Sequence, residues 1–169
     1  MTGAGRCIRP VALSDHAWAP FGWLPVEDTD PRDGSERLFF KWADPHVNVI
    51  GHRRDEVPAV AGGLRCEILY RHDTHTQTIM PLDTEAVIAV APADETFDEA
   101  SSWKRIVAFW LHPLEAIVLH RGTWHWGPFP TAAEAVRLFN VQALRYPEDN
   151  VSVDLAARGL SVEVLTTVS

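Results

Sequence analysis

Residues 64–72 read Leu-Arg-Cys-Glu-Ile-Leu-Tyr-Arg-His, and this stretch decides the fold class that we predict for the chain. Side chains alternate between the two faces of a β-strand. One face of a strand over Leu64–His72 therefore holds Leu64, Cys66, Ile68, Tyr70 and His72. The other face holds Arg65, Glu67, Leu69 and Arg71. We expect the first face to point into the core, where His72 needs a hydrogen bond or a metal because an unpaired buried polar group is costly.

Short apolar runs separated by prolines and glycines continue on both sides of this stretch, a pattern typical of an all-β domain. Further strands are predicted at Leu38–Trp42, Val47–His52, Gln77–Met80, Ala86–Ala91, Lys104–Leu111, Ala116–His120 and Val136–Leu144. Ser14 is a good N-cap for a short helix over Asp15–Trp18, and a second helix or turn is predicted over Asp98–Trp103. The acidic stretch Glu27–Ser35 is predicted to be a loop. A barrel suits this number of strands because closure removes exposed edges.

Length, charge and cysteine content limit the class of protein. The 169 residues fit a single domain over residues 1–169. A formal net charge of −8 disfavours nucleic acid and anionic membrane surfaces as partners. The apolar runs are too short to cross a bilayer. Two cysteines without a CxxC spacing, and no expected secretory leader, favour a cytoplasmic location. The sequence contains no GxSxG, so covalent catalysis by a serine elbow is disfavoured.

Two polar segments contain the residues best suited to chemistry. The first is residues 70–81, Tyr-Arg-His-Asp-Thr-His-Thr-Gln-Thr-Ile-Met-Pro, and the second is residues 119–128, Leu-His-Arg-Gly-Thr-Trp-His-Trp-Gly-Pro. The sequence between them forms strands, so the two segments can meet on facing strands of one barrel. A divalent metal of borderline softness prefers imidazole nitrogens with an oxygen donor. His72, Gln77 and His125 are the candidate metal ligands.

The spacing of these ligands resembles the cupin superfamily, in which HxH is followed by a glutamate and, on a later strand, by a third histidine after a glycine turn. His72 and Gln77 occupy the positions of the second histidine and the acid. Gly122-Thr123-Trp124-His125 resembles the turn and the third histidine. Tyr70 stands where the first histidine would be. The resemblance implies a cupin-type, jelly-roll-like β-barrel with a short N-terminal helix and loop decorations.

A resemblance to the ureidoglycolate lyase family covers nearly the whole chain. It rests on Pro10-Val11-Ala12-Leu13-Ser14 through Phe21-Gly22, on Arg71-His72 with Thr76-Gln77 and Met80-Pro81, on His120-Arg121 with Trp124-His125 and Pro128, and on Asp149-Asn150-Val151. Two places depart from the family pattern. His75 lies where a glycine is usual, and residues 28–34 have no clear counterpart.

The resemblance implies cleavage of ureidoglycolate to glyoxylate and urea. A base removes the hydroxyl proton, the C–N bond breaks, and an acid protonates the departing nitrogen. His125 and His120 are the candidate catalytic residues, and a divalent Mn, Ni or Zn ion would bind the hydroxyl and carboxylate oxygens. Arg53, Arg71 or Lys41 are candidates to bind the carboxylate, with Trp124 lining the pocket. A homodimer is expected by analogy.

Other interpretations of the same residues remain open. His125, His72 and Gln77 are also compatible with hydrogen-bonded structural groups. His75 would join the site only if the loop after His72 folds inward, and the histidines interpreted as solvated or capping residues are His16, His46, His52 and His112. The domain could instead be a non-catalytic small-molecule-binding or regulatory cupin domain, or a cupin enzyme acting on another small hydroxy or amido acid. Tyr70 in place of a histidine argues against a redox-active iron site.

Overall fold

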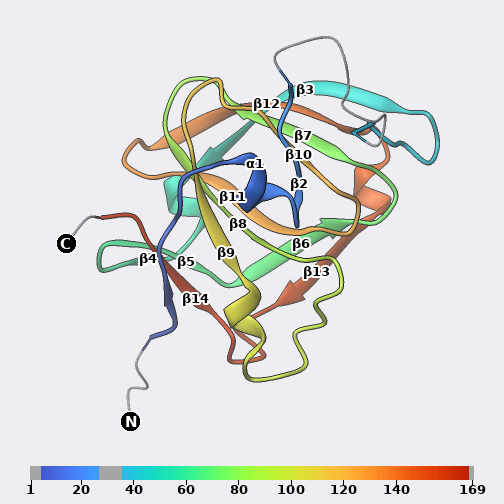
Figure 1. Ribbon diagram of the computed structural model, residues 1–169. Coiled ribbons are helices and arrows are strands. Elements are labelled where there is room, and N and C mark those ends of the chain that lie inside the picture. The colour runs from blue at the N-terminus through green and yellow to red at the C-terminus, as the bar shows by residue number, and fades with distance from the viewer. Residues whose placement is uncertain (1–4, 27–35, 168–169) are drawn as a thin grey trace.

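Strands dominate the computed structural model of the protein, which describes residues 5–26 and 36–167 (Figure 1). The strands are β1 Cys7–Ile8, β2 Gly22–Trp23, β3 Pro45–Arg53, β4 Ala59–Val60, β5 Gly63–Cys66, β6 Ile68–His72, β7 Gln77–Pro81, β8 Ala86–Ala91, β9 Val107–Leu111, β10 Ile117–Leu119, β11 Trp124–Pro130, β12 Ala135–Ala143, β13 Asn150–Asp154 and β14 Val162–Leu165. The helices are α1 Asp15–Trp18 and three 3-10 turns at Arg54–Glu56, Ser102–Arg105 and Tyr146–Glu148. The loop predicted over Glu27–Ser35 lies outside the described residues.

The predicted N-terminal helix is confirmed as α1, and it is attached to the β-structure by one tryptophan. Ser14 caps the helix by accepting a hydrogen bond from the amide of Ala17. Trp18 is fully buried, and its indole N–H donates to the carbonyl of Val118 on β10. Gly22 follows directly against the same strand, where an added Cβ would lie 1.7 Å from the Val118 oxygen. Only glycine therefore fits at the start of β2.

The strands form three sheets. Sheet I has the order β2-β10-β7-β12-β3, and sheet II has the order β13-β6-β11-β8-β9. Sheet III is smaller, with the order β1-β14-β5-β4. From β6 to β13 the chain repeatedly crosses between sheets I and II, which is the double-sheet arrangement of a jelly roll. The all-β, cupin-like fold is therefore confirmed.

The closed barrel is the part of the fold prediction that needs correction. In the described residues, sheets I and II are not hydrogen-bonded to each other into a cylinder. After β6 the chain leaves sheet II, and after a short turn it enters sheet I as β7. Two facing sheets therefore enclose the interior, and side-chain packing rather than a continuous ladder joins them.

Strand β8 shows how the layers are held together. All six of its residues are buried, because both faces of the strand are covered. Ala86, Ile88 and Val90 pack in a core with residues of sheet I, including Ile117 and Leu138. The intervening Val87, Ala89 and Ala91 pack in a second core with residues of sheet III. A continuous apolar run is the expected sequence of such a strand.

The stretch 64–72 forms two strands rather than the single strand predicted. Leu64 and Cys66 lie on β5 in sheet III, whereas β6 belongs to sheet II, and Glu67 separates the two strands. The carbonyl of Glu67 accepts hydrogen bonds from the amides of residues 155 and 156 and so leaves the strand ladder. Alternation is preserved within β6, but the predicted core face is wrong there: Leu69 enters the core, whereas Ile68 and Tyr70 are 37% and 38% exposed. Ile68, Tyr70 and His72 share the opposite face and line a cavity.

Three other strand or helix predictions differ from the structure. Residues 38–42 form no strand and make only an isolated bridge between Phe40 and His75. The strand predicted at Lys104–Leu111 begins at Val107, because Ser102–Arg105 form a 3-10 turn. The helix or turn predicted over Asp98–Trp103 is this same 3-10 turn, which lies later in the chain, at Ser102–Arg105.

Candidate active site

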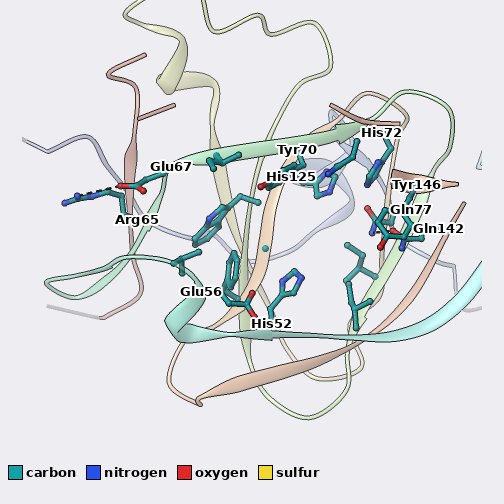
Figure 2. A pocket seen from close by; sticks show the side chains of 18 of the residues that line it. His52, Glu56, Arg65, Glu67, Tyr70, His72, Gln77, His125, Gln142 and Tyr146 are labelled. Atoms are coloured by element: carbon teal, nitrogen blue, oxygen red, sulfur yellow. Dashed lines mark hydrogen bonds and ion pairs between the residues drawn. The ribbon is translucent and has the colours of Figure 1, made fainter. Parts of the chain in front are cut away.

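A cavity of about 480 Å³ opens between sheets I and II (Figure 2). Strands β6 and β11 of sheet II form one wall, and β3 and β7 of sheet I form the other. The cavity is lined by Ile50, His52, Glu56, Val57, Pro58, Arg65, Glu67, Ile68, Tyr70, His72, Gln77, Ile79, His125, Trp126, Gly127, Phe129, Gln142, Tyr146 and Asn150. The three predicted metal ligands, His72, Gln77 and His125, are thus brought together in one cavity.

His72 and His125 lie side by side because their strands are neighbours in sheet II. His125 is paired with Tyr70, two residues before His72 on β6, and the two imidazole centroids are 5.4 Å apart. His125 Nδ1 lies 3.2 Å from the carbonyl oxygen of Thr123, and His72 Nδ1 lies 3.4 Å from that of Asp149. A carbonyl only accepts, so each Nδ1 is the protonated donor. Each neutral ring is left with Nε2 as a free acceptor.

Burial favours the neutral form of both rings. Burial, followed by the neighbouring His72, lowers the pKa of His125 to about 3. Burial also lowers the pKa of His72, although the hydrogen bond to the Asp149 carbonyl and the Asp149 charge act in the opposite direction. His72 is consequently the better proton acceptor of the two, and His125 keeps its lone pair available at any ordinary pH.

Gln77 completes this group from the facing sheet. Its side-chain N–H₂ donates to Asn140 Oδ1 at 2.9 Å and to Gln142 Oε1 at 3.4 Å. Asn140 in turn donates to Asn48 Oδ1 at 2.8 Å, which fixes the orientation of the whole amide chain. The amide oxygen of Gln77 is buried without a hydrogen-bond partner. Such an unsatisfied acceptor is costly unless a ligand satisfies it.

His52 belongs to the same cavity, although the sequence predicted a solvated or capping residue. Its Nδ1 lies 2.9 Å from the carbonyl oxygen of Pro128, so its Nε2 is also a free acceptor when the ring is neutral. Figure 2 shows His52 across the cavity from His125. The signal that could have found it is the alternation in β3, where His46, Asn48, Ile50 and His52 share one half-buried face.

His75 folds inward behind His72. The two rings stack at 4.5 Å, and Asp149 Oδ2 lies 3.4 Å from His75 Nδ1. Burial, followed by the nearby His72, lowers the pKa of His75 to about 4. Ligand atoms of His72, His75 and Asp149 all lie within 4.8 Å of one another. The Asp149 carboxylate already accepts hydrogen bonds from the amides of Asp73 and Thr74 and from the Thr74 hydroxyl, so it also organises the turn between β6 and β7.

The residues predicted to bind a carboxylate lie outside the cavity. Arg53 is exposed and forms an ion pair with Asp55 at 3.0 Å. Lys41 is exposed and lies over the Trp42 ring. Arg71 stacks on Trp124, which is itself buried in the core between sheets II and III. These positions follow from strand alternation, since Arg71 and Trp124 precede His72 and His125 and face the opposite side of sheet II.

His120 also lies elsewhere. It lines a second, more open hollow together with Arg37, Arg71 and Arg121, and its ring packs against Trp23 at 5.3 Å. Its neighbour Arg121 stacks on Phe39, with its guanidinium carbon 4.1 Å from the ring centroid. His120 and Arg121 therefore line one hollow and His125 lines another, although these residues are close in sequence.

The buried group of His72, His75 and Asp149 could hold a metal ion, and the cavity presents further metal-ligand atoms beside it. Gln77 Oε1 is a buried oxygen donor without a partner, and His72 and His125 each present a free Nε2. Two imidazoles and an amide oxygen suit Mn, Ni or Zn. The carbonyl groups that accept from both Nδ1 atoms are the outer contacts that usually hold metal-binding histidines in one tautomer.

Comparison with known proteins bears on the same residues. No curated protein is similar enough to the chain to count as a match. In the described residues, no helix is both long enough and apolar enough to span a membrane. The model of one protein family, described as ureidoglycolate lyase, matches residues 5–163. This match covers both histidine-bearing segments and nearly the whole fold. The chain therefore belongs to the ureidoglycolate lyase family.

Proposed function

We propose that the cavity between sheets I and II cleaves the C–N bond of ureidoglycolate and releases glyoxylate and urea. Membership of the family makes the protein a lyase. The observation that best supports the location is the convergence of three unpaired acceptors. They are Nε2 of His72, Nε2 of His125 and the buried amide oxygen of Gln77. A hydroxyl and a urea group together present several N–H and O–H donors, which these acceptors can satisfy.

The hydroxyl proton of the substrate passes to His72 in this mechanism. Asp149 stabilises the resulting imidazolium through its backbone carbonyl and its charge. As the O–H bond breaks, the carbonyl of glyoxylate forms and the electron pair of the C–N bond moves to the departing nitrogen. His125 is less basic, so its free Nε2 accepts a hydrogen bond from a urea N–H group of the substrate rather than removing a proton.

The departing nitrogen requires a proton, and Tyr70 is placed to supply it. Tyr70 lies on the same cavity face as His72 and is paired with His125 across the sheet. In the cupin pattern a histidine stands at this position, whereas Tyr70 offers a hydroxyl group that can donate a proton. Tyr70 therefore gives this site an acid where a third metal-binding histidine would otherwise stand.

Neutral donors hold the substrate carboxylate in this proposal. Gln142 accepts from Gln77 through its oxygen, which leaves its N–H₂ group as a donor beside the cavity. Asn150 adds a second amide from β13. Arg65 lines the cavity but is paired with Glu163 at 3.3 Å, and Figure 2 shows it pointing away from the histidines.

A divalent metal would be held by His72, Gln77 and His125, and His72 acts as the base only when its Nε2 holds no metal. When bound, it supplies Lewis-acid chemistry at the hydroxyl and carboxylate oxygens. The homodimer and the cytoplasmic location stay predictions.

The test is release of glyoxylate from ureidoglycolate by the purified protein, measured as isolated, after chelation, and after adding Mn²⁺ or Ni²⁺. Release above the spontaneous rate is expected, and the chelation arm reports whether a metal takes part. His72→Ala and His125→Ala should each lower kcat at least about 100-fold with the fold intact. The matched control is His112→Ala, because His112 is exposed and pairs with Glu85 outside the cavity. Binding without turnover in every arm would overturn the proposal and favour a ligand-binding domain.

A further inference from the structure

The two ends of the cavity differ in chemistry. The polar end consists of His72, Gln77, His125, Gln142 and Asn150, and the other end has the apolar residues Ile50, Val57, Ile68, Trp126 and Phe129. His52, Glu56, Arg65 and Glu67 also line the cavity. On both walls of the cavity, the pairing of the strands places the polar residues at one end and the apolar residues at the other. On sheet II, β6 runs from Ile68 to His72. On sheet I, the pairing of β12 with β3 places Gln142 opposite His46 and Leu138 opposite Ile50.

The distance between the two ends follows from strand geometry. Ile68 and His72 are four positions apart along β6. Gln142 and Leu138, which lies opposite Ile50, are also four positions apart along β12. At about 3.3 Å per residue, each wall extends about 13 Å from the polar to the apolar end. The cavity of about 480 Å³ would hold roughly sixteen waters at about 30 Å³ each. Ureidoglycolate has only about nine non-hydrogen atoms, so the polar end alone accommodates it.

The apolar end is not closed by the protein's own packing. Ile68 is 37% exposed although it faces the cavity. Trp126 and Phe129 pack against each other with ring centroids 4.7 Å apart, and Phe129 also contacts His52 at 5.0 Å. A concave apolar wall next to a few polar groups is the usual form of a site for a ligand with an apolar part. Ureidoglycolate has no such part.

We propose that the preferred substrates are ureidoglycolates whose distal urea nitrogen bears an apolar substituent, which lies along Ile50, Ile68 and Phe129. This inference rests on the proposed function, because it places the reacting carbon at the polar end. The reaction is the same for the larger substrate. The hydroxyl loses its proton, the C=O bond forms, the C–N bond breaks, and the departing nitrogen takes its electron pair and a proton. The products are glyoxylate and a substituted urea.

The test compares ureidoglycolate with its N-butyl derivative, carrying the butyl group on the distal nitrogen. Both release glyoxylate, so one assay measures both after subtraction of the spontaneous rates. A fully buried methylene group contributes about fourfold to binding. We therefore expect kcat/KM to be at least tenfold higher for the butyl compound. Turnover of ureidoglycolate with an equal or lower kcat/KM for the butyl compound would overturn this inference and leave the proposed function standing. Turnover of neither compound would overturn both.

Two variants of β3 test whether the apolar end produces the preference. Ile50→Thr changes a residue that faces the cavity, and Val49→Thr makes a similar change on the outer face, where Val49 is 58% exposed. Ile50→Thr should lower the butyl-to-parent ratio of kcat/KM at least threefold, whereas Val49→Thr should leave it unchanged. Because the readout is a ratio of two substrates, a general loss of folded enzyme does not affect it. An equal ratio in both variants would contradict the assigned position of the substituent.

Discussion

Lowering the pH from 8 to 5 should remove several kcal/mol from the folding stability of this protein, because two buried histidines resist protonation. Burial is the leading cause in both cases and lowers the pKa of His125 to about 3 and that of His75 to about 4. An unfolded histidine titrates near pH 6.5. Between these values the unfolded chain binds more protons than the folded chain, so stability falls as the pH drops below 6.5.

The size of this effect follows from the same pKa values. At pH 5 the pH lies about 1.5 units below the pKa of an unfolded histidine. At about 1.4 kcal/mol per pH unit, protonation of that histidine favours the unfolded state by about 2 kcal/mol. His75 and His125 together therefore cost about 4 kcal/mol, and His72, whose pKa is also lowered by burial, acts in the same direction. With a denaturant slope of about 2 kcal/mol per M, the urea midpoint should fall by about 2 M.

Urea unfolding followed by tryptophan fluorescence at pH 8, 6.5 and 5 measures this loss, since the chain contains seven tryptophans. His75→Leu removes one of the two groups and should reduce the fall between pH 8 and pH 5 by about half. The matched control, His16→Leu, replaces an exposed histidine on α1 and should reproduce the parent's fall. A loss of less than about 1 kcal/mol in the parent, or a loss in His75→Leu as large as that in the parent, would contradict the role given to the buried histidines.

Three further predictions concern single sites. His120→Ala should keep at least half of the glyoxylate-releasing activity, because His120 lines a different hollow from His125. A loss of activity as large as that of His125→Ala would show that His120 is catalytic. Gln77→Leu leaves the Asn140 oxygen without its donor and should lower the free energy of unfolding by about 1–3 kcal/mol in urea titrations, and an unchanged midpoint would contradict that bond. Gly22→Ala should lower stability by about 3 kcal/mol or more, because its Cβ would overlap a backbone oxygen. Gly51→Ala, whose nearest neighbour would be 3.8 Å away, is its control in thermal unfolding, and equal melting temperatures would refute the overlap.

Local patterns in the sequence predicted much of this protein correctly. The apolar run over 86–91 and the capped turn after Ser14 match β8 and α1 as they stand in the structure. Alternation within 68–72 placed His72 on an inward face, since neighbouring residues on a strand must point in opposite directions. The family resemblance drawn from the motifs at 71–81 and 120–128 is confirmed by the family match.

The tertiary structure alone decided which strands face the cavity. Glu67 divides residues 64–72 between two sheets. A short-range sequence pattern cannot show this division, because it depends on hydrogen bonds from the amides of residues 155 and 156 to the Glu67 carbonyl. His52 enters the cavity, whereas Arg53 and Arg71 do not, because register between distant strands determines which alternating face meets another sheet. Side-chain periodicity is a local property of the backbone and is therefore encoded in the sequence. The pairing of sheets I and II across the cavity is a long-range property, since it depends on packing between segments far apart in the chain.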